Sequence, residues 1–191
     1  GGRPVFLPLN GGREPLQFYW TAFLVALGLP FSFLTLKLGA ALVSVATVPL
    51  AFGLGRAVGG RGVGLLAALT LALAPWHIQI TRIALRTGWS PLFAAACLWL
   101  LVRALEHGRR NDWLMLGIAT GLGMYGYSGF RPMAVLLVLA IAGKLWLDAR
   151  RRGQSFSVRT FVPPALARNL AVAAGAALAT TAPLIRYALD R

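Results

Sequence analysis

Long stretches without a charged residue constrain the fold of this chain most strongly. Roughly five or six stretches of about 15–20 residues carry no charge, and short segments with arginine separate them. An apolar helix needs about 20 residues to cross roughly 30 Å of hydrocarbon, and only helices and closed barrels satisfy their backbone groups there. We therefore expect an all-α fold: a polytopic transmembrane helix bundle with about six spans plus one interfacial helix.

Composition supports a membrane protein and argues against other classes. The 191 residues are 58% hydrophobic, and the mean hydropathy is +0.69, whereas a soluble domain has about a quarter charged residues. The net charge of +14 lies in short clusters between apolar stretches rather than in one stripe. Anionic membrane lipids explain these clusters better than nucleic acid, so we expect membrane lipids as partners and no nucleic acid.

The two ends of the chain and its cysteine content limit the possible domain organisation. Residues 1–191 are interpreted as a single transmembrane domain, and the start at Gly1 and the end after an apolar run indicate a fragment of a longer membrane protein. Cys97 is the only cysteine, so no disulfide forms within the chain. Because it lies inside an apolar run, we expect a buried, inert thiol.

Glycine, proline and charge divide the chain into expected elements. A helix near Leu16–Leu29 is short and begins with aromatic residues, which favours a position along the interface. A glycine-rich turn is expected at Gly55–Arg61, and Gly117 with Gly121 favours close helix packing. The expected spans are Leu38–Gly55, Gly62–Trp76, Pro91–Val102, Trp113–Tyr125, Pro132–Leu147 and Asn169–Leu184.

Arginine and lysine set the expected orientation. The side of the bundle that holds Arg150, Arg151 and Arg152 carries more positive charge, so we assign it to the cytoplasm of a multi-pass protein in the bacterial inner membrane. The arginines on the outer side oppose this rule and need another reason to be there. Anion binding is the first candidate.

Polar side chains from three expected outer loops form the candidate site. Arg82 and Arg86 are four residues apart, so a helical segment would place both guanidinium groups on one face, where they suit a phosphate. Contact with lipid phosphates is the alternative. The complete set of candidate residues is Glu14, His77, Arg82, Arg86, Tyr125, Tyr127 and Arg131.

Each member of this set also has a structural alternative. Glu14 precedes Pro15 at a helix start, which suits a general base, a metal ligand or a partner of a substrate amine, and equally a capping residue. His77 and the tyrosines suit either substrate binding or anchoring at the interface, and Arg131 either binding or capping. No nucleotide-binding, hydrolase or metal motif is present in the sequence. No cofactor is therefore predicted with certainty, and a divalent metal stays open.

Several short motifs, taken in order, resemble the GT-C glycosyltransferases. They are Gly12-Arg13-Glu14-Pro15-Leu16 followed by Phe18-Tyr19-Trp20, then Leu54-Gly55-Arg56, Gly60–Leu69, Ala74–Ile78 with Arg82 and Arg86, Gly121–Tyr127, and Arg131-Pro132. The chain is similar to glycosyltransferase family 39, which includes the dolichyl-phosphate-mannose protein mannosyltransferases and bacterial aminoarabinose transferases. The resemblance runs from about Gly11 to Leu147.

The resemblance implies an integral membrane enzyme that takes a sugar from a polyprenyl-phosphate donor. The acceptor would be a protein, a lipid or a glycan on the outer or periplasmic side. Glu14 matches the acidic residue of the family's Glu-(Lys)-Pro motif, although the lysine is missing here. The family's essential aspartate, in a first outer loop, is also absent, so we expect residues 1–191 alone to be inactive. The alternative is a non-catalytic transporter or a lipid-binding structural subunit.

Overall fold

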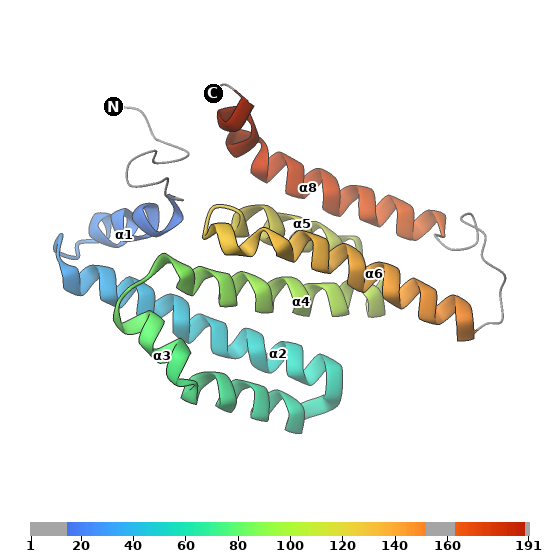
Figure 1. Cartoon of the computed structure of the whole chain (residues 1–191), viewed down its shortest axis with the longest axis horizontal. Coiled ribbons are helices and arrows are strands. Elements are labelled where there is room, and N and C mark those ends of the chain that lie inside the picture. The colour runs from blue at the N-terminus through green and yellow to red at the C-terminus, as the bar shows by residue number, and fades with distance from the viewer. Residues whose placement is uncertain (1–14, 152–162, 190–191) are drawn as a thin grey trace.

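The computed structural model describes residues 15–151 and 163–189, and each regular element in these two ranges is a helix (Figure 1). The predicted all-α fold is therefore confirmed. The predicted number of spans is too high. Four helical stretches in the described ranges are long and apolar enough to cross a membrane, at Phe33–Leu73, Arg86–His107, Ser128–Arg151 and Pro164–Tyr187.

The first helix, α1 (Leu16–Ala26), has 11 residues and is too short to cross a bilayer. The chain leaves it at Gly28, whose positive φ of 100° suits glycine, and then reaches Pro30. The indole Nε1 of Trp20 donates a hydrogen bond to the Gly39 carbonyl oxygen at 3.0 Å. This bond fixes α1 beside the beginning of the next helix.

One continuous helical stretch, α2 (Phe33–Leu73), is in fact a hairpin with two arms. Its first turn is capped by Ser32, whose hydroxyl accepts a hydrogen bond from the Thr35 amide. The reversal occurs at Gly59 and Gly60, where Gly60 has a φ of 83°. The two arms correspond to two of the predicted spans, and the predicted glycine turn is confirmed. The second arm, residues 61–73, is too short to cross a bilayer as one helix, which is one reason for the excess in the prediction.

The core of the bundle is built around α4 (Trp89–His107), with its buried stripe at helical spacing. It packs with α5 (Arg110–Gly123), α6 (Pro132–Arg151) and the first arm of α2. The stripe consists of Trp89, Phe93, Cys97, Leu101 and Ala104. Cys97 is fully buried, as predicted, and its Sγ lies 3.5 Å from the Thr120 hydroxyl.

The last helix, α8 (Pro164–Leu189), packs closely against α5 through the predicted glycine pair. A Cβ atom added at Gly117 would lie 2.8 Å from the Ala176 Cβ, and closer still to the Ala173 carbonyl oxygen. The small-residue prediction is therefore confirmed. However, α5 has only 14 residues, so the predicted span Trp113–Tyr125 falls short of a full crossing.

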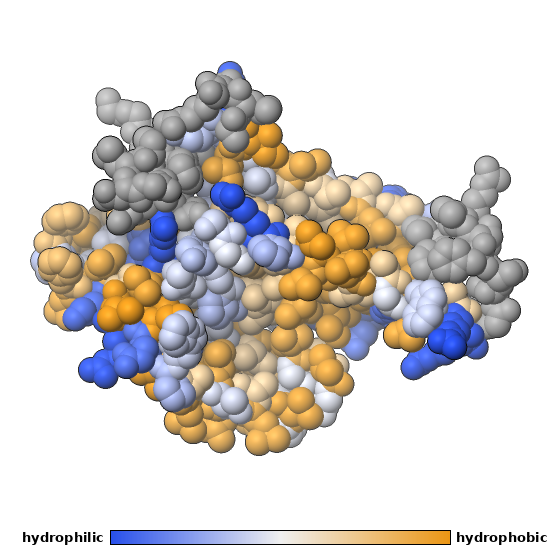
Figure 2. All heavy atoms as spheres, in the orientation of Figure 1, coloured by the Kyte–Doolittle hydropathy of each residue, from blue (hydrophilic) through white to orange (hydrophobic). Residues whose placement is uncertain are grey.

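The helices run between two ends of the molecule, which Figure 1 shows on the left and right. The site end holds α1, the short helix α3 (Pro75–Arg82), and the 3₁₀ turns η1 (Arg86–Gly88) and η2 (Ser128–Phe130). The opposite end holds the Gly59–Gly60 turn and the connection from α4 to α5. There Arg103 pairs with Asp112 at 3.1 Å, and Asn169 donates to the Gly108 carbonyl oxygen. Figure 2 shows extensive apolar surface, with hydrophilic residues mainly towards the two ends.

Candidate functional site

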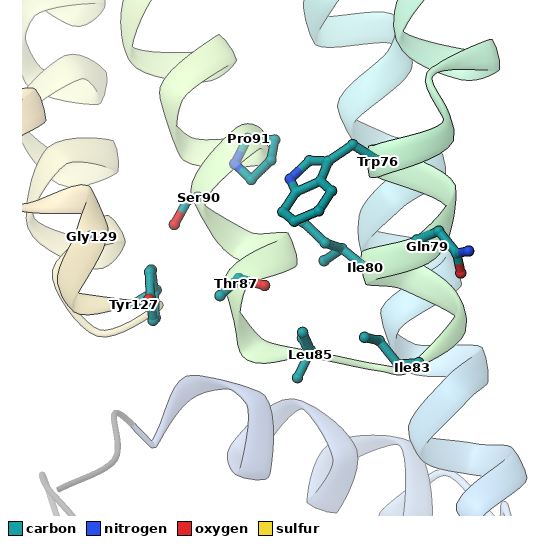
Figure 3. Close-up of a pocket in the computed structure, with 10 residues that line it drawn as sticks. All are labelled: Trp76, Gln79, Ile80, Ile83, Leu85, Thr87, Ser90, Pro91, Tyr127 and Gly129. Carbon is teal, nitrogen blue, oxygen red and sulfur yellow. The ribbon is translucent and has the colours of Figure 1, made fainter. Parts of the chain in front are cut away.

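A pocket of about 460 Å³ lies at the site end, between α3 and the beginning of α4 (Figure 3). The loop that carries η2 closes a third side. Most of its surface is apolar, and its lining residues are Trp76, Gln79, Ile80, Ile83, Leu85, Thr87, Ser90, Pro91, Tyr127 and Gly129. Two segments that are distant in sequence, 76–91 and 127–129, therefore build one cavity, and Tyr127 is the member of the predicted set that lines it.

The α3 wall of this pocket forms because Pro75 occupies the first helical turn, where a missing N–H costs nothing. His77 faces the other way. Its ring is buried, and its Nε2 lies 2.7 Å from the Ser44 hydroxyl on the first arm of α2. The residues of α3 that line the pocket are Trp76, Gln79 and Ile80. His77 thus joins α3 to α2 and does not line the pocket.

Arg82 and Arg86 do not share a helix face, so the helical premise of the sequence prediction is wrong. Arg82 is the last residue of α3, and the chain then turns through Ala84, a non-glycine residue with a φ of 52°. Arg86 begins η1 after an extended Leu85. The chain breaks the helix between the two arginines, so their four-residue spacing no longer stacks their side chains. Arg82 is exposed, whereas Arg86 is half-buried.

Arg86 lies at the rim of the pocket against Tyr127. Its guanidinium carbon is 5.8 Å from the centroid of the Tyr127 ring, within the range of a cation–π interaction. The ring leaves no space for a side chain at position 129, because a Cβ added at Gly129 would lie 2.5 Å from Tyr127 Cε1. Glycine there allows Tyr127 to fold over its own loop. The structure thus brings together two of the predicted site residues and places one of them in the pocket wall.

Tyr125 turns away from this pocket and contacts α8. Its hydroxyl donates a hydrogen bond of 2.9 Å to the Thr180 carbonyl oxygen. Burial raises the pKa of Tyr125 above its ordinary value of 10.0, and a hydrogen bond with the Leu184 backbone opposes that shift. The Tyr125 carbonyl oxygen also accepts from the Leu16 amide, which links this loop to the start of α1.

The two remaining predicted residues are not part of the pocket lining. Arg131 is exposed at the beginning of α6, next to Pro132. Glu14 lies outside the described residues, and Pro15, which follows it, is buried beside the start of α1. Among residues 15–151 and 163–189, no three histidine, cysteine or acidic side chains gather as metal ligands.

Sequence reasoning missed the two hydroxyl residues of the pocket, Thr87 and Ser90. Thr87 lies in η1 and Ser90 in the first turn of α4, on either side of the buried Trp89. A threonine and a serine just before Pro91 are typical of a helix start, and that signal identifies the position. It does not indicate a pocket, because the opposing wall comes from α3 and η2.

The fold and the pocket define an integral membrane protein that exposes an apolar cavity at one end of its bundle. The family of dolichyl-phosphate-mannose-protein mannosyltransferases matches residues 13–174, most of the chain, so the chain belongs to this family. It is accordingly a membrane glycosyltransferase of the GT-C type, and the resemblance seen in the sequence is confirmed. The family implies a polyprenyl-phosphate sugar donor in a membrane context. No curated protein and no solved structure matches the chain significantly.

Proposed function

We propose that this pocket holds the polyprenyl-phosphate donor and that the sugar passes to an acceptor on the outer, periplasmic side of a bacterial inner membrane. The observation that carries the proposal is the position of Arg86 at the rim of an apolar pocket, against Tyr127. Apolar walls suit an isoprenoid chain, and a guanidinium group suits its phosphate. An anionic lipid would satisfy both parts of this pocket at once.

The pocket opens towards lipid along its α3 wall. Trp76 is 77% exposed, Ile83 is 61% exposed and Leu85 is 44% exposed, and all three line the pocket. In a membrane protein, such side chains face hydrocarbon or the interface rather than water. The donor chain therefore has a route from the bilayer to Arg86. Arg82 and Arg131 are exposed at the same end and add positive charge that attracts an anionic headgroup.

The proposed transfer breaks the bond between the sugar's anomeric carbon and the phosphate oxygen. The electron pair stays on that oxygen, and the Arg86 guanidinium stabilises the developing negative charge. The acceptor's hydroxyl oxygen bonds to the anomeric carbon, and its proton passes to a carboxylate. Glu14 is the residue that we propose for this role, from its match to the family motif.

Transfer by the purified full-length protein in lipid nanodiscs, with a polyprenyl-phosphate sugar as donor, tests the proposal. Loss of a charge-assisted hydrogen bond costs about 1.5–3 kcal/mol, so Arg86→Ala should slow transfer by about 10- to 100-fold. Arg86→Lys should lose less. Arg82→Ala should have a smaller effect, because Arg82 is exposed. Arg56→Ala, which removes an exposed guanidinium near the opposite end, is the matched control.

Unchanged transfer in the double variant Arg82→Ala with Arg86→Ala would refute the assignment of the pocket. Binding of the lipid without any transfer by the full-length protein would instead favour the lipid-binding structural subunit. The same assay on residues 1–191 alone tests the prediction that they are inactive.

A further inference from the structure

A buried side-chain hydrogen bond ties α1 to the beginning of α4. Gln17 is only 5% exposed, and its Oε1 accepts a hydrogen bond of 2.7 Å from the indole Nε1 of Trp89. An indole nitrogen only donates, so the amide oxygen and not the amide nitrogen faces it, which fixes the orientation of the Gln17 amide. The bond joins residues 72 positions apart and lies inside the protein, where water does not compete for it.

The loop between α5 and η2 contacts the same point. Its Tyr125 carbonyl oxygen accepts a hydrogen bond of 3.4 Å from the Leu16 amide. A Cβ added at Gly126 would lie 3.0 Å from the Trp89 Cβ and 3.7 Å from the Leu16 Cδ2, so the loop backbone packs against both residues. Three segments that are distant in sequence thus meet around the bond between Gln17 and Trp89.

Aromatic packing surrounds this junction, but the hydrogen bond gives it direction. The Trp89 ring stacks on Phe93 and meets Trp20 edge to face, with centroid distances of 6.0 and 6.1 Å. Apolar burial is non-directional, whereas a hydrogen bond requires a defined distance and angle. The Gln17 bond therefore determines how the first turn of α1 sits against α4.

Each of the two bonded residues follows a residue that we propose for the transfer. Glu14 precedes Gln17 by three residues, and Arg86 precedes Trp89 by three residues. Three residues of chain span at most about 11 Å, so the bond joins the short stretches that carry the proposed base and the proposed phosphate-binding group. A displacement of about 1 Å between reacting groups can slow a reaction about 100-fold. The alignment of these two stretches therefore matters for the transfer.

We propose that Gln17 is a positioning residue for the sugar transfer, because its bond to Trp89 holds the stretch that carries Glu14 against the stretch that carries Arg86. The inference rests on the proposed function and adds to it a residue that touches neither the donor nor the acceptor. Gln17 is not among the residues that line the pocket, so binding of the donor does not need it. Transfer does need it, since the base and the phosphate-binding group must act at the same time.

The transfer assay on the full-length protein in nanodiscs tests this role, with bound polyprenyl phosphate used to count the folded sites. Gln17→Met keeps the length of the side chain and removes the acceptor oxygen. The kcat per lipid-binding site should fall by about 10- to 100-fold, while the KM for the donor should change less than about twofold. Thr21→Val is the matched control on α1, since the Thr21 hydroxyl bonds within its own helix to the Gln17 carbonyl oxygen. It should leave both constants unchanged.

A double-mutant cycle separates the hydrogen bond from general packing. Trp89→Phe removes the same bond from the other side, keeps an aromatic ring, and should lower kcat by itself. The double variant should lose no more kcat than the more affected single variant, whereas independent effects would multiply.

Three results would overturn the proposal. They are multiplied losses in the double variant, an unchanged kcat in Gln17→Met, and fewer lipid-binding sites with an unchanged kcat at each remaining site. The last result is the one that a purely structural role produces. Failure of the wild-type protein to bind or use the donor lipid would instead refute the proposed function itself.

Discussion

Substitution of Gly117 by alanine tests the packing that holds α8 against α5. The added Cβ would lie 2.8 Å from the Ala176 Cβ, whereas carbon atoms pack best at about 3.5–4.0 Å. The nearest atom, the Ala173 carbonyl oxygen, belongs to the backbone and cannot rotate away. The two helices must therefore separate by roughly 1 Å. Overpacking of this kind costs about 1–3 kcal/mol.

The matched control is Gly175→Ala on α8. An added Cβ at Gly175 would meet no atom within 4 Å. The gain of about 0.5–1 kcal/mol from replacing a helical glycine by alanine applies to both variants and cancels in their comparison. We therefore expect Gly117→Ala to unfold at a free energy about 1–3 kcal/mol below that of Gly175→Ala.

Reversible unfolding in mixed micelles with increasing denaturing detergent measures this difference. The same separation should also lengthen the hydrogen bond of 2.9 Å from the Tyr125 hydroxyl to the Thr180 carbonyl oxygen. Equal stability of the two variants would refute the conclusion that α5 and α8 are in backbone contact.

Three further perturbations have definite expected outcomes. Gly60→Ala should lower the free energy of unfolding by about 1–2 kcal/mol, because Gly60 has a φ of 83°. Gly62→Ala should not lower it, because an added Cβ at Gly62 would meet no atom within 4 Å. The same unfolding titration compares the two variants. Asp112→Asn should cost about 1–2 kcal/mol, since it breaks the pair with the partly exposed Arg103; no loss relative to Asp148→Asn would contradict this. Because the pKa of Tyr125 is higher in the folded protein, Tyr125 loses its proton in the unfolded protein first as the pH rises. The free energy of unfolding should therefore fall as the pH rises above 10.0. Thermal unfolding should show a smaller fall in Tyr125→Phe.

The helices were predictable because lipid imposes a simple rule on sequence. Uncharged runs, a glycine pair at the hairpin and prolines at helix starts locate most elements, since backbone groups in hydrocarbon must bond within the same segment. The number of crossings was less predictable. Apolarity alone did not show that α5 stops after 14 residues, or that the second arm of α2 ends at Leu73, too soon for a full crossing.

Two of the predicted site residues, Arg86 and Tyr127, lie together in the structure, but the contacts of the others were not predictable. Outer-loop positions put Arg86 and Tyr127 in the same region, and the structure joins them. No proline marks the break after Arg82, and the positive φ of Ala84 is uncommon for a residue other than glycine. The bond from His77 to Ser44 and that from Tyr125 to Thr180 join residues 33 and 55 positions apart, and spacing alone does not reveal such pairs.

The exposed apolar wall formed by Trp76, Ile83 and Leu85 determines which ligand concentration controls the occupancy of the pocket. A molecule that enters between these side chains arrives by lateral diffusion within one leaflet and not by collision from water. Its relevant concentration is a mole fraction of the surrounding lipid. Dilution of the protein in buffer should then leave occupancy unchanged, whereas dilution of the ligand with inert phospholipid should lower it.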